Sequence, residues 1–179
     1  MRTLSLLVAV AATLGTACAS TLQQLTMDEM IRQSTAIVRA KVLGSHAEAR
    51  GRDIYTYYKL RVTENLKSAG SQQLDLAVPG GTAAGLRQRV GGAPELNAGG
   101  DYVFFLWTSR TGVTQIIGLS QGLFSVMRNH AGDAVLVRPA ATETMVDKSG
   151  RVVTDQAVTL SLSELKSRIQ PLADGKQHK

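Results

Sequence analysis

Two arginines are the residues whose spacing first suggests a chemical role. Arg87 and Arg89 stand one residue apart, so in an extended segment both side chains point to the same side of the chain. Two guanidinium groups placed in this way can bind a carboxylate or a phosphate through forked hydrogen bonds. The alternative is that both arginines are solvated residues beside a short strand.

A second candidate set forms an aromatic and basic stripe. Residues 54–66 alternate apolar and polar side chains, which predicts a strand with one buried face. The other face carries Tyr55, Tyr57, Lys59 and Arg61. On a barrel of the oligonucleotide/oligosaccharide-binding (OB) type, such a stripe can stack on bases or sugars and pair with phosphates. A half-exposed strand face covered by amphipathic side chains explains it as well.

Residues for metal binding do not form a recognisable set. His46, His130 and His178 are far apart, and the chain has no cysteine pair, no H-E-x-x-H and no Asp/Asn-rich calcium loop. We therefore expect no metal site and no cofactor.

One short motif resembles that of a serine hydrolase. Residues 118–122 match G-x-S-x-G around Ser120, but that nucleophile elbow needs a helix after the turn, and residues 123–127 have the pattern of a strand. We expect no catalytic residues, and a hydrolase with an unrecognised site stays open as an alternative.

The arginine pair lies inside the one long irregular segment, residues 79–101. This segment holds seven of the 17 glycines, and a loop of that length in a compact domain is either functional or disordered. It lacks both the Lys-Ser/Thr pair of a P-loop and the G-x-G-x-x-G spacing of a dinucleotide site. We expect its glycines to supply positive φ angles in turns.

The elements that must position these residues are predicted to be short strands, with a helix near each end. Alternation and turn residues predict strands at 36–43, 54–66, 74–78, 102–107, 113–119, 123–127 and 134–137, and a hairpin around 147–150. Capping boxes that begin at Thr26 and Ser161 predict helices at about 27–33 and 162–169, the second ending before Pro171.

These elements predict a mostly β fold: a small antiparallel barrel of OB type, or a sandwich, with short helices at the N- and C-terminal ends. A run of apolar residues at 102–107 predicts a central strand that is buried on both sides. The expected core comprises Val38, Val42, Leu60, Val62, Leu76, Val103, Phe105, Trp107, Ile117 and Phe124.

The first 19 residues have the order of a secretory signal peptide. Arg2 precedes an eleven-residue apolar stretch, and Ala17 and Ala19 occupy the two positions that a signal peptidase reads. We expect cleavage after Ala19, a periplasmic or secreted protein, and no transmembrane segment afterwards. The alternative is a lipoprotein acylated at Cys18, although Gly15 stands where a lipobox usually has an aliphatic residue. Residues 20–170 then form a single domain, and residues 171–179 a disordered tail.

Two resemblances follow from short pieces of the sequence. Residues 36–42, 54–57, 60–67, 78–81, 92–96, 102–106 and 118–124 resemble an uncharacterised family of exported bacterial domains, which implies export but no activity. The first two pieces are also similar to the netrin-like OB barrel of tissue metalloproteinase inhibitors. That resemblance implies a barrel, but those inhibitors place an N-terminal cysteine amine on the protease zinc and are held by disulfides. A chain beginning at Ser20 contains no cysteine, so the inhibitory mechanism does not carry over.

Charge and export together suggest the class of partner. The net charge is +6, which favours contact with anionic surfaces, while export removes the chain from ordinary nucleic acid. We expect a non-catalytic binding module that contacts another envelope or secreted protein, or an anionic polymer, through residues 79–101. A lipid-anchored structural envelope protein is the alternative.

Overall fold

Strands dominate the computed structural model, which describes residues 21–68 and 70–174. They make up 51% of the structure and are accompanied by two α-helices, so the chain is mostly β, as predicted. The elements are β1 (Thr21–Gln23), α1 (Met27–Gln33), β2 (Ala36–Arg50), β3 (Asp53–Lys67), β4 (Gln73–Pro79), β5 (Gly81–Ala83), β6 (Leu86–Gln88), β7 (Asp101–Thr108), β8 (Thr114–Ile116), the 3-10 turn η1 (Leu119–Gly122), β9 (Leu123–Arg128), β10 (Ala134–Arg138), β11 (Thr144–Val146), β12 (Val152–Val153), β13 (Val158–Ser161) and α2 (Leu162–Asp174). The predicted signal peptide and Cys18 lie outside the described residues.

Strand β7 lies at the centre of the largest sheet. The strand order is β13-β10-β9-β7-β2-β3-β4, and β8 also pairs with β7. All of these pairings are antiparallel. From Tyr102 to Leu106 every residue of β7 is buried, which confirms the predicted central strand. Polar residues at these positions would have no solvent on either face, so the strand needs its apolar sequence.

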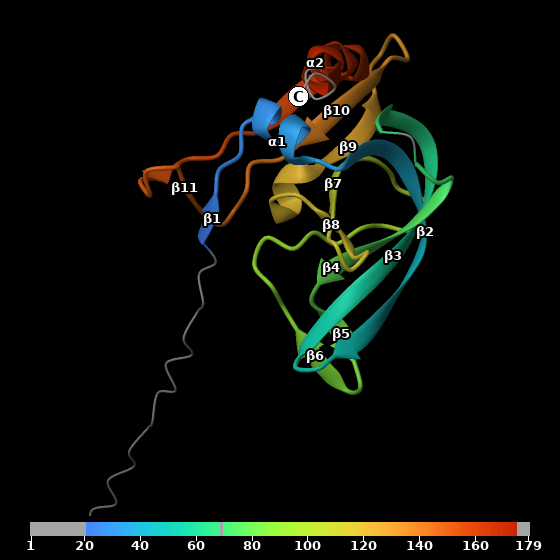
Figure 1. Cartoon of the computed structure of the whole chain (residues 1–179), viewed down its shortest axis with the longest axis vertical. Coiled ribbons are helices and arrows are strands. Elements are labelled where there is room, and N and C mark those ends of the chain that lie inside the picture. The colour runs from blue at the N-terminus through green and yellow to red at the C-terminus, as the bar shows by residue number, and fades with distance from the viewer. Residues whose placement is uncertain (1–20, 69, 175–179) are drawn as a thin grey trace, which may run out of the picture.

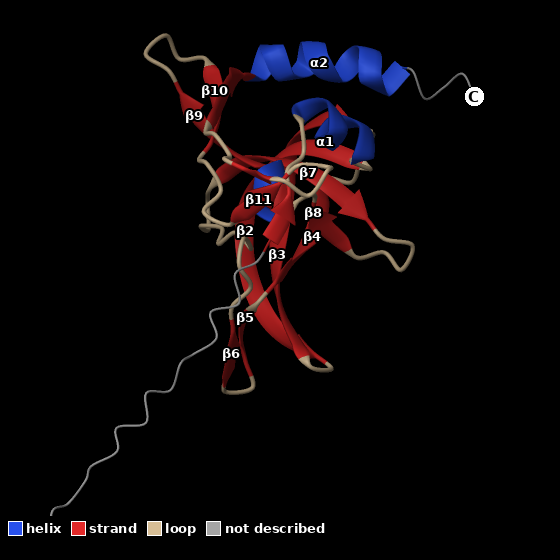
Figure 2. Ribbon diagram, turned by 90° about the vertical axis from the view of Figure 1, so that its left-hand side faces the viewer, coloured by secondary structure: helices blue, strands red, loops and turns tan. Residues whose placement is uncertain are grey.

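The two faces of β7 belong to two different hydrophobic cores. Val103 and Phe105 pack in one cluster with residues of α1 and α2, which lie together at one end of the molecule (Figure 2). Phe104 and Leu106 pack in a second cluster with residues of β2, β3 and β4. The long β2–β3 hairpin curves around this second core toward β5 and β6 at the opposite end (Figure 1).

The large sheet does not close into a barrel within the described part of the chain. Its last strand, β4, lies near β8, but no hydrogen-bonded pairing joins the two. The pairing of β2 with β3 contains three register shifts, and such bulges increase the twist of a strand. The predicted closed barrel is therefore not found, and the shape is that of a curved, open antiparallel sheet.

Both predicted helix starts are confirmed, the first with a complete capping box and the second with the hydroxyl half of one, since Glu164 pairs with Arg168 instead. At α1 the Thr26 side chain accepts the N–H of Glu29, and the Glu29 carboxylate accepts the N–H of Thr26. At α2 the Ser161 hydroxyl accepts the N–H of Glu164 at 3.0 Å. Each of these bonds satisfies a donor that the helix itself leaves free. No helix among the described residues combines the length and apolar character needed to cross a membrane.

Two local predictions are wrong. Trp107 was expected in the core but is 46% exposed, because the pairing of β7 with β2 ends at Leu106 and Trp107 faces only Gln115 of β8. Helix α2 was expected to end before Pro171 but continues to Asp174. Pro171 cannot donate the usual bond, yet Leu172 packs against the helix-covered core, which favours one further helical turn. Part of the expected tail is thus helical, and residues 175–179 lie outside the description.

A buried ion pair ties the segments after β10 to the sheet. Arg138 donates to Asp155 through both terminal nitrogens at 2.6 and 3.1 Å, and their side chains are only 8% and 4% exposed. Asp155 also accepts the N–H of Ala141 at 2.7 Å. Burial raises the pKa of the Asp155 carboxyl, but the hydrogen bonds from Arg138 and Ala141 outweigh burial and hold it at about 2.

Removing one member of this pair should strongly destabilise the fold. Arg138→Ala leaves the Asp155 carboxylate buried without its counter-charge, and such a loss costs about 3–5 kcal/mol. Equilibrium urea unfolding of the variant measures the cost. Arg168→Ala, which removes an exposed ion pair with Glu164, is the matched control and should leave the midpoint nearly unchanged. Equal midpoints for the two variants would contradict the assigned role of Arg138.

The same pair predicts the direction of the acid response. The folded pKa of Asp155, about 2, lies below its ordinary value of 3.8, so its contribution to stability is complete above about pH 4 and is lost as the pH falls toward 2. Urea midpoints measured from pH 5 to pH 2 should therefore decline in the wild type. In Arg138→Ala the decline should be shallower, because Asp155 has lost the partner that lowers its pKa. An unchanged slope would show that other carboxylates account for the acid response.

Candidate functional site

The segment 79–101 is an ordered structure that contains a small hairpin. β5 and β6 pair antiparallel around Ala84 and Gly85, whose φ angles are +50° and +74°. Two positive φ angles in a two-residue connection are typical of a type I′ turn. Gly81 has φ +137°, and a Cβ there would lie 2.4 Å from the Thr56 hydroxyl. The glycines thus supply positive φ angles in turns, as the sequence predicted, and Gly81 in addition permits a close approach.

Strands β3 and β7 and the turn η1 hold this segment in place; β7 does so through the Tyr102 hydroxyl, which accepts the N–H of Asn97 at 3.3 Å. The Thr56 hydroxyl of β3 donates to the carbonyl of Gly80 at 2.8 Å. The hydroxyl of Tyr58, also on β3, accepts the N–H of Leu96 at 3.3 Å. The carbonyl of Gly92 accepts the N–H of Ser120 in η1 at 3.1 Å. In Figure 1 the loop after β6 arcs away from the sheet before it returns to β7.

A groove lies between this segment and the sheet. It consists of a cavity of about 690 Å³, lined by the inner face of β3 and residues 78–82 and 87–97, and an adjoining cavity of about 430 Å³ beside residues 138–143. The two cavities share residues 92–95, Asn97 and Glu143. We call them together the loop groove. Openings at the end of a curved β-sheet are common ligand sites.

Four exposed or half-exposed charges line the loop groove. Arg87 and Arg89 come from β6 and the residue after it, and Glu95 and Glu143 also line the cavity wall. Arg87 and Arg89 were the first candidates from the sequence, and the structure places both at this groove. Their forked N–H donors can bind carboxylate or phosphate oxygens, while the two glutamates disfavour a ligand that is anionic throughout.

The lining of the loop groove includes Ser120, which borders the smaller of its two cavities, but no histidine or cysteine. Nowhere in the described residues do three His, Cys, Asp or Glu side chains gather for a metal. Ser120 lies in the η1 turn and is followed by strand β9, so the helix of a nucleophile elbow is missing. The chemistry that the groove offers is charged and hydrogen-bonding recognition.

The aromatic stripe lies on the other face of β3. Alternation points Thr56 and Tyr58 into the groove and Tyr55 and Tyr57 away from it. Tyr57 stacks on His46 with ring centroids 5.4 Å apart, and its hydroxyl accepts a hydrogen bond from Arg50 at 3.2 Å. These contacts show that part of the stripe packs against its own neighbours on β2.

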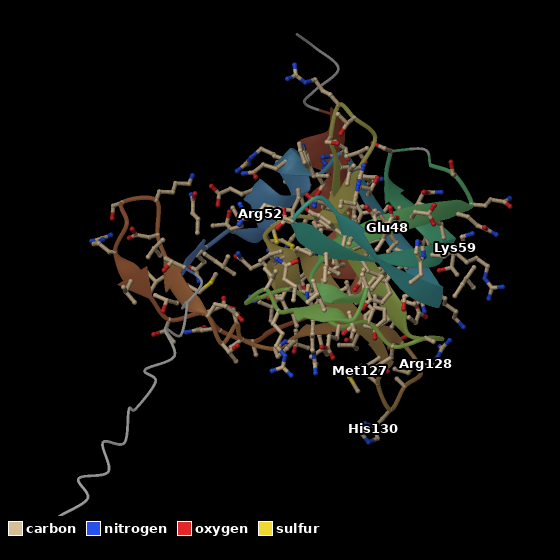
Figure 3. All side chains as sticks on the ribbon, turned by 90° about the horizontal axis from the view of Figure 1, so that it is seen from below. Glu48, Arg52, Lys59, Met127, Arg128 and His130 are labelled. Atoms are coloured by element: carbon tan, nitrogen blue, oxygen red, sulfur yellow. The ribbon has the colours of Figure 1, made fainter. Side chains whose placement is uncertain are left out.

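The basic half of the stripe continues along the same face of β3 beyond the tyrosines. Lys59 and Arg61 are exposed on β3, and Figure 3 shows Lys59 projecting from the long hairpin that also carries Glu48. His130 lies with Met127 and Arg128 on the distant β9–β10 hairpin, so the structure does not bring the described histidines together. His178 lies outside the described residues. The arginine pair in the loop groove and the aromatic and basic stripe on β3 are therefore two separate sites.

Gln121 is a residue that the sequence analysis missed. Its side chain is only 2% exposed, accepts the N–H of Leu25 at 2.9 Å and donates to the carbonyl of Gln23 at 3.0 Å. It thereby fastens the N-terminal segment to η1, which in turn holds Gly92. The neighbouring Gly118, with φ +61°, was the available signal of a tight turn built around this side chain.

Comparison of the chain with protein-family models, curated proteins and solved structures found no match. The geometry of the loop groove and the aromatic stripe therefore carries the functional argument.

The close approach at Gly81 gives a test of how the groove is built. Gly81→Ala adds a Cβ beside the Thr56 hydroxyl and imposes strain at φ +137°, which should cost about 1–3 kcal/mol. Thermal unfolding measures the loss. Gly44→Ala on β2 is the control, because a Cβ there meets nothing within 4 Å. A melting temperature equal to that of the control would mean that the segment is not held against β3.

Proposed function

We propose that this protein is an exported, non-catalytic binding module whose loop groove receives a partner with anionic groups. One observation carries the proposal: the long glycine-rich segment is an ordered wall, and it sets Arg87 and Arg89 beside a cavity of about 690 Å³. The segment is held by β3, β7 and η1, so it is ordered before a partner binds. Binding then carries a smaller loss of conformational entropy.

The charges of the groove support an anionic partner of limited charge density. The guanidinium groups of Arg87 and Arg89 are exposed, and no ion pair within the described residues engages them. Glu95 and Glu143 on the same lining would repel a uniformly anionic ligand. A polypeptide that carries spaced carboxylates fits this pattern better than a dense polyanion.

The proposal also includes the type of fold and the cellular location. We infer an OB-like arrangement, in which the curved β2–β3–β4 half forms the mouth of an incomplete barrel and the groove lies at that mouth. Signal-peptide cleavage after Ala19 would deliver the domain to the periplasm or the exterior, where envelope proteins and anionic polymers are available. Ligands commonly bind at such mouths.

The proposal predicts that the two arginines determine binding. With a random copolymer of glutamate and alanine, whose carboxylates are spaced by neutral residues, as the probe in biolayer interferometry, Arg87→Ala/Arg89→Ala should bind about tenfold more weakly than wild type, because each exposed charge contributes up to about 1 kcal/mol. Raising the salt from 50 to 500 mM should weaken wild-type binding, since both contacts are exposed.

The matched control is Arg110→Ala/Arg128→Ala, which removes the same charge from the exposed β7–β8 turn and from the exposed last residue of β9. It should keep wild-type affinity. If the control variant weakens as much as the groove variant, net charge and not the groove governs binding, and the proposal fails.

A further inference from the structure

Strand β6 presents a free backbone edge. It pairs only with β5 among the described strands, in the register Gly81↔Gln88, Thr82↔Arg87 and Ala83↔Leu86. In a two-residue hairpin the residues beside the turn, Ala83 and Leu86, exchange both backbone hydrogen bonds, and the bonded pairs then alternate. The N–H and C=O groups of Arg87 therefore point away from β5.

The same alternation extends to Arg89. Continuing the register, Arg89 lies opposite Gly80. The N–H of Gly80 points away from β6 and donates to the carbonyl of Ile54 at 2.7 Å, as expected where the two opposite residues do not bond to each other. The backbone groups of Arg87 and Arg89 thus form two successive unpaired positions on one edge. Residues 87–91 line the larger cavity of the loop groove, so this edge borders the groove.

Backbone and side chains at this edge select the same kind of ligand. An extended peptide pairs with a free strand edge through main-chain hydrogen bonds, and side chains at alternate positions give specificity. In an antiparallel addition the residues opposite Arg87 and Arg89 stand two apart, with Cβ atoms about 5 Å from those of the arginines. Acidic residues there would pair with both guanidinium groups.

Glu95 and Glu143 limit the composition of such a peptide. Both line the same groove, so acidic residues at every position would place further carboxylates against them. Acidic residues at alternate positions, with neutral residues between, satisfy both constraints. Short, charged edges also protect sheets from aggregation, and this protective role is the alternative that the experiment must separate from binding.

We propose that an extended polypeptide with acidic residues at alternate positions adds as an antiparallel strand to the free edge of β6. The inference rests on the proposed function and names the class of its partner. It predicts a register: residues opposite Arg87 and Arg89 form bonded pairs with them, and so donate their own N–H groups to β6.

The test uses a synthetic probe and its N-methylated forms. The full chain is titrated into fluorescently labelled acetyl-(Thr-Glu)4-amide, and anisotropy reports binding. N-methylation of the glutamates removes the N–H groups that should reach β6, whereas N-methylation of the threonines removes those that point away. Both forms carry the same number of methyl groups and the same charge.

Strand addition predicts that methylated glutamates weaken binding at least tenfold and that methylated threonines change it less than twofold. Equal affinities for both forms, or a loss confined to the threonine series, would overturn the antiparallel strand. If the probe does not bind while the glutamate–alanine copolymer still distinguishes the groove variant from its control, strand addition fails and the proposed function stands. If the copolymer does not distinguish them either, both fail.

Discussion

The structure depends on the burial of strand β7 from both sides. Its odd-numbered residues fill the core beneath the two helices, and its even-numbered residues fill the core inside the curved half of the sheet. Phe104 and Phe105, adjacent in sequence, are both fully buried yet belong to different cores. Because period-two geometry sends neighbouring side chains to opposite faces, this one strand joins the helical end of the molecule to the end that carries the groove.

Polar contacts hold the peripheral segments that the cores do not reach. The ion pair of Arg138 and Asp155 fixes Ala141, and with it the segment 139–143 that forms the far side of the loop groove. Gln121 performs the same task from the opposite side, since it anchors η1, to which Gly92 is hydrogen-bonded. Such bonds add specificity as well as stability, because a buried polar group left without its partner is costly. The shape of the groove therefore depends on residues that do not line it.

Local patterns in the sequence predict most elements but not how the strands are assembled. Alternation predicts β3, β4 and β9, and the capping boxes predict both helix starts, because these features depend on residues within one turn or one strand. Whether β4 pairs with β8 is decided by contacts between distant segments that no local pattern indicates, and the predicted closure of the barrel was wrong. Trp107 was placed in the core because apolar character alone does not show where a neighbouring strand ends. Arg87 and Arg89 were found from their spacing. The burial of Gln121 depends instead on contacts with Gln23 and Leu25, which lie far away in the sequence.

The glycines of the loop groove explain why a long irregular segment can form a defined wall. Gly81 lets the hairpin lie against Thr56 at a distance that no side chain permits, and the positive φ of Gly92 accompanies contacts with η1 and the segment after β10. Each glycine adds flexibility to the unfolded chain, so the segment is ordered only because hydroxyl and backbone bonds from β3, β7 and η1 offset that entropy. This arrangement leaves the outer edge of β6 without a strand partner, while the arginines on that edge remain exposed. A rigid edge that retains unmet hydrogen-bonding capacity and two unpaired positive charges is suited to recognising an extended, partly acidic chain.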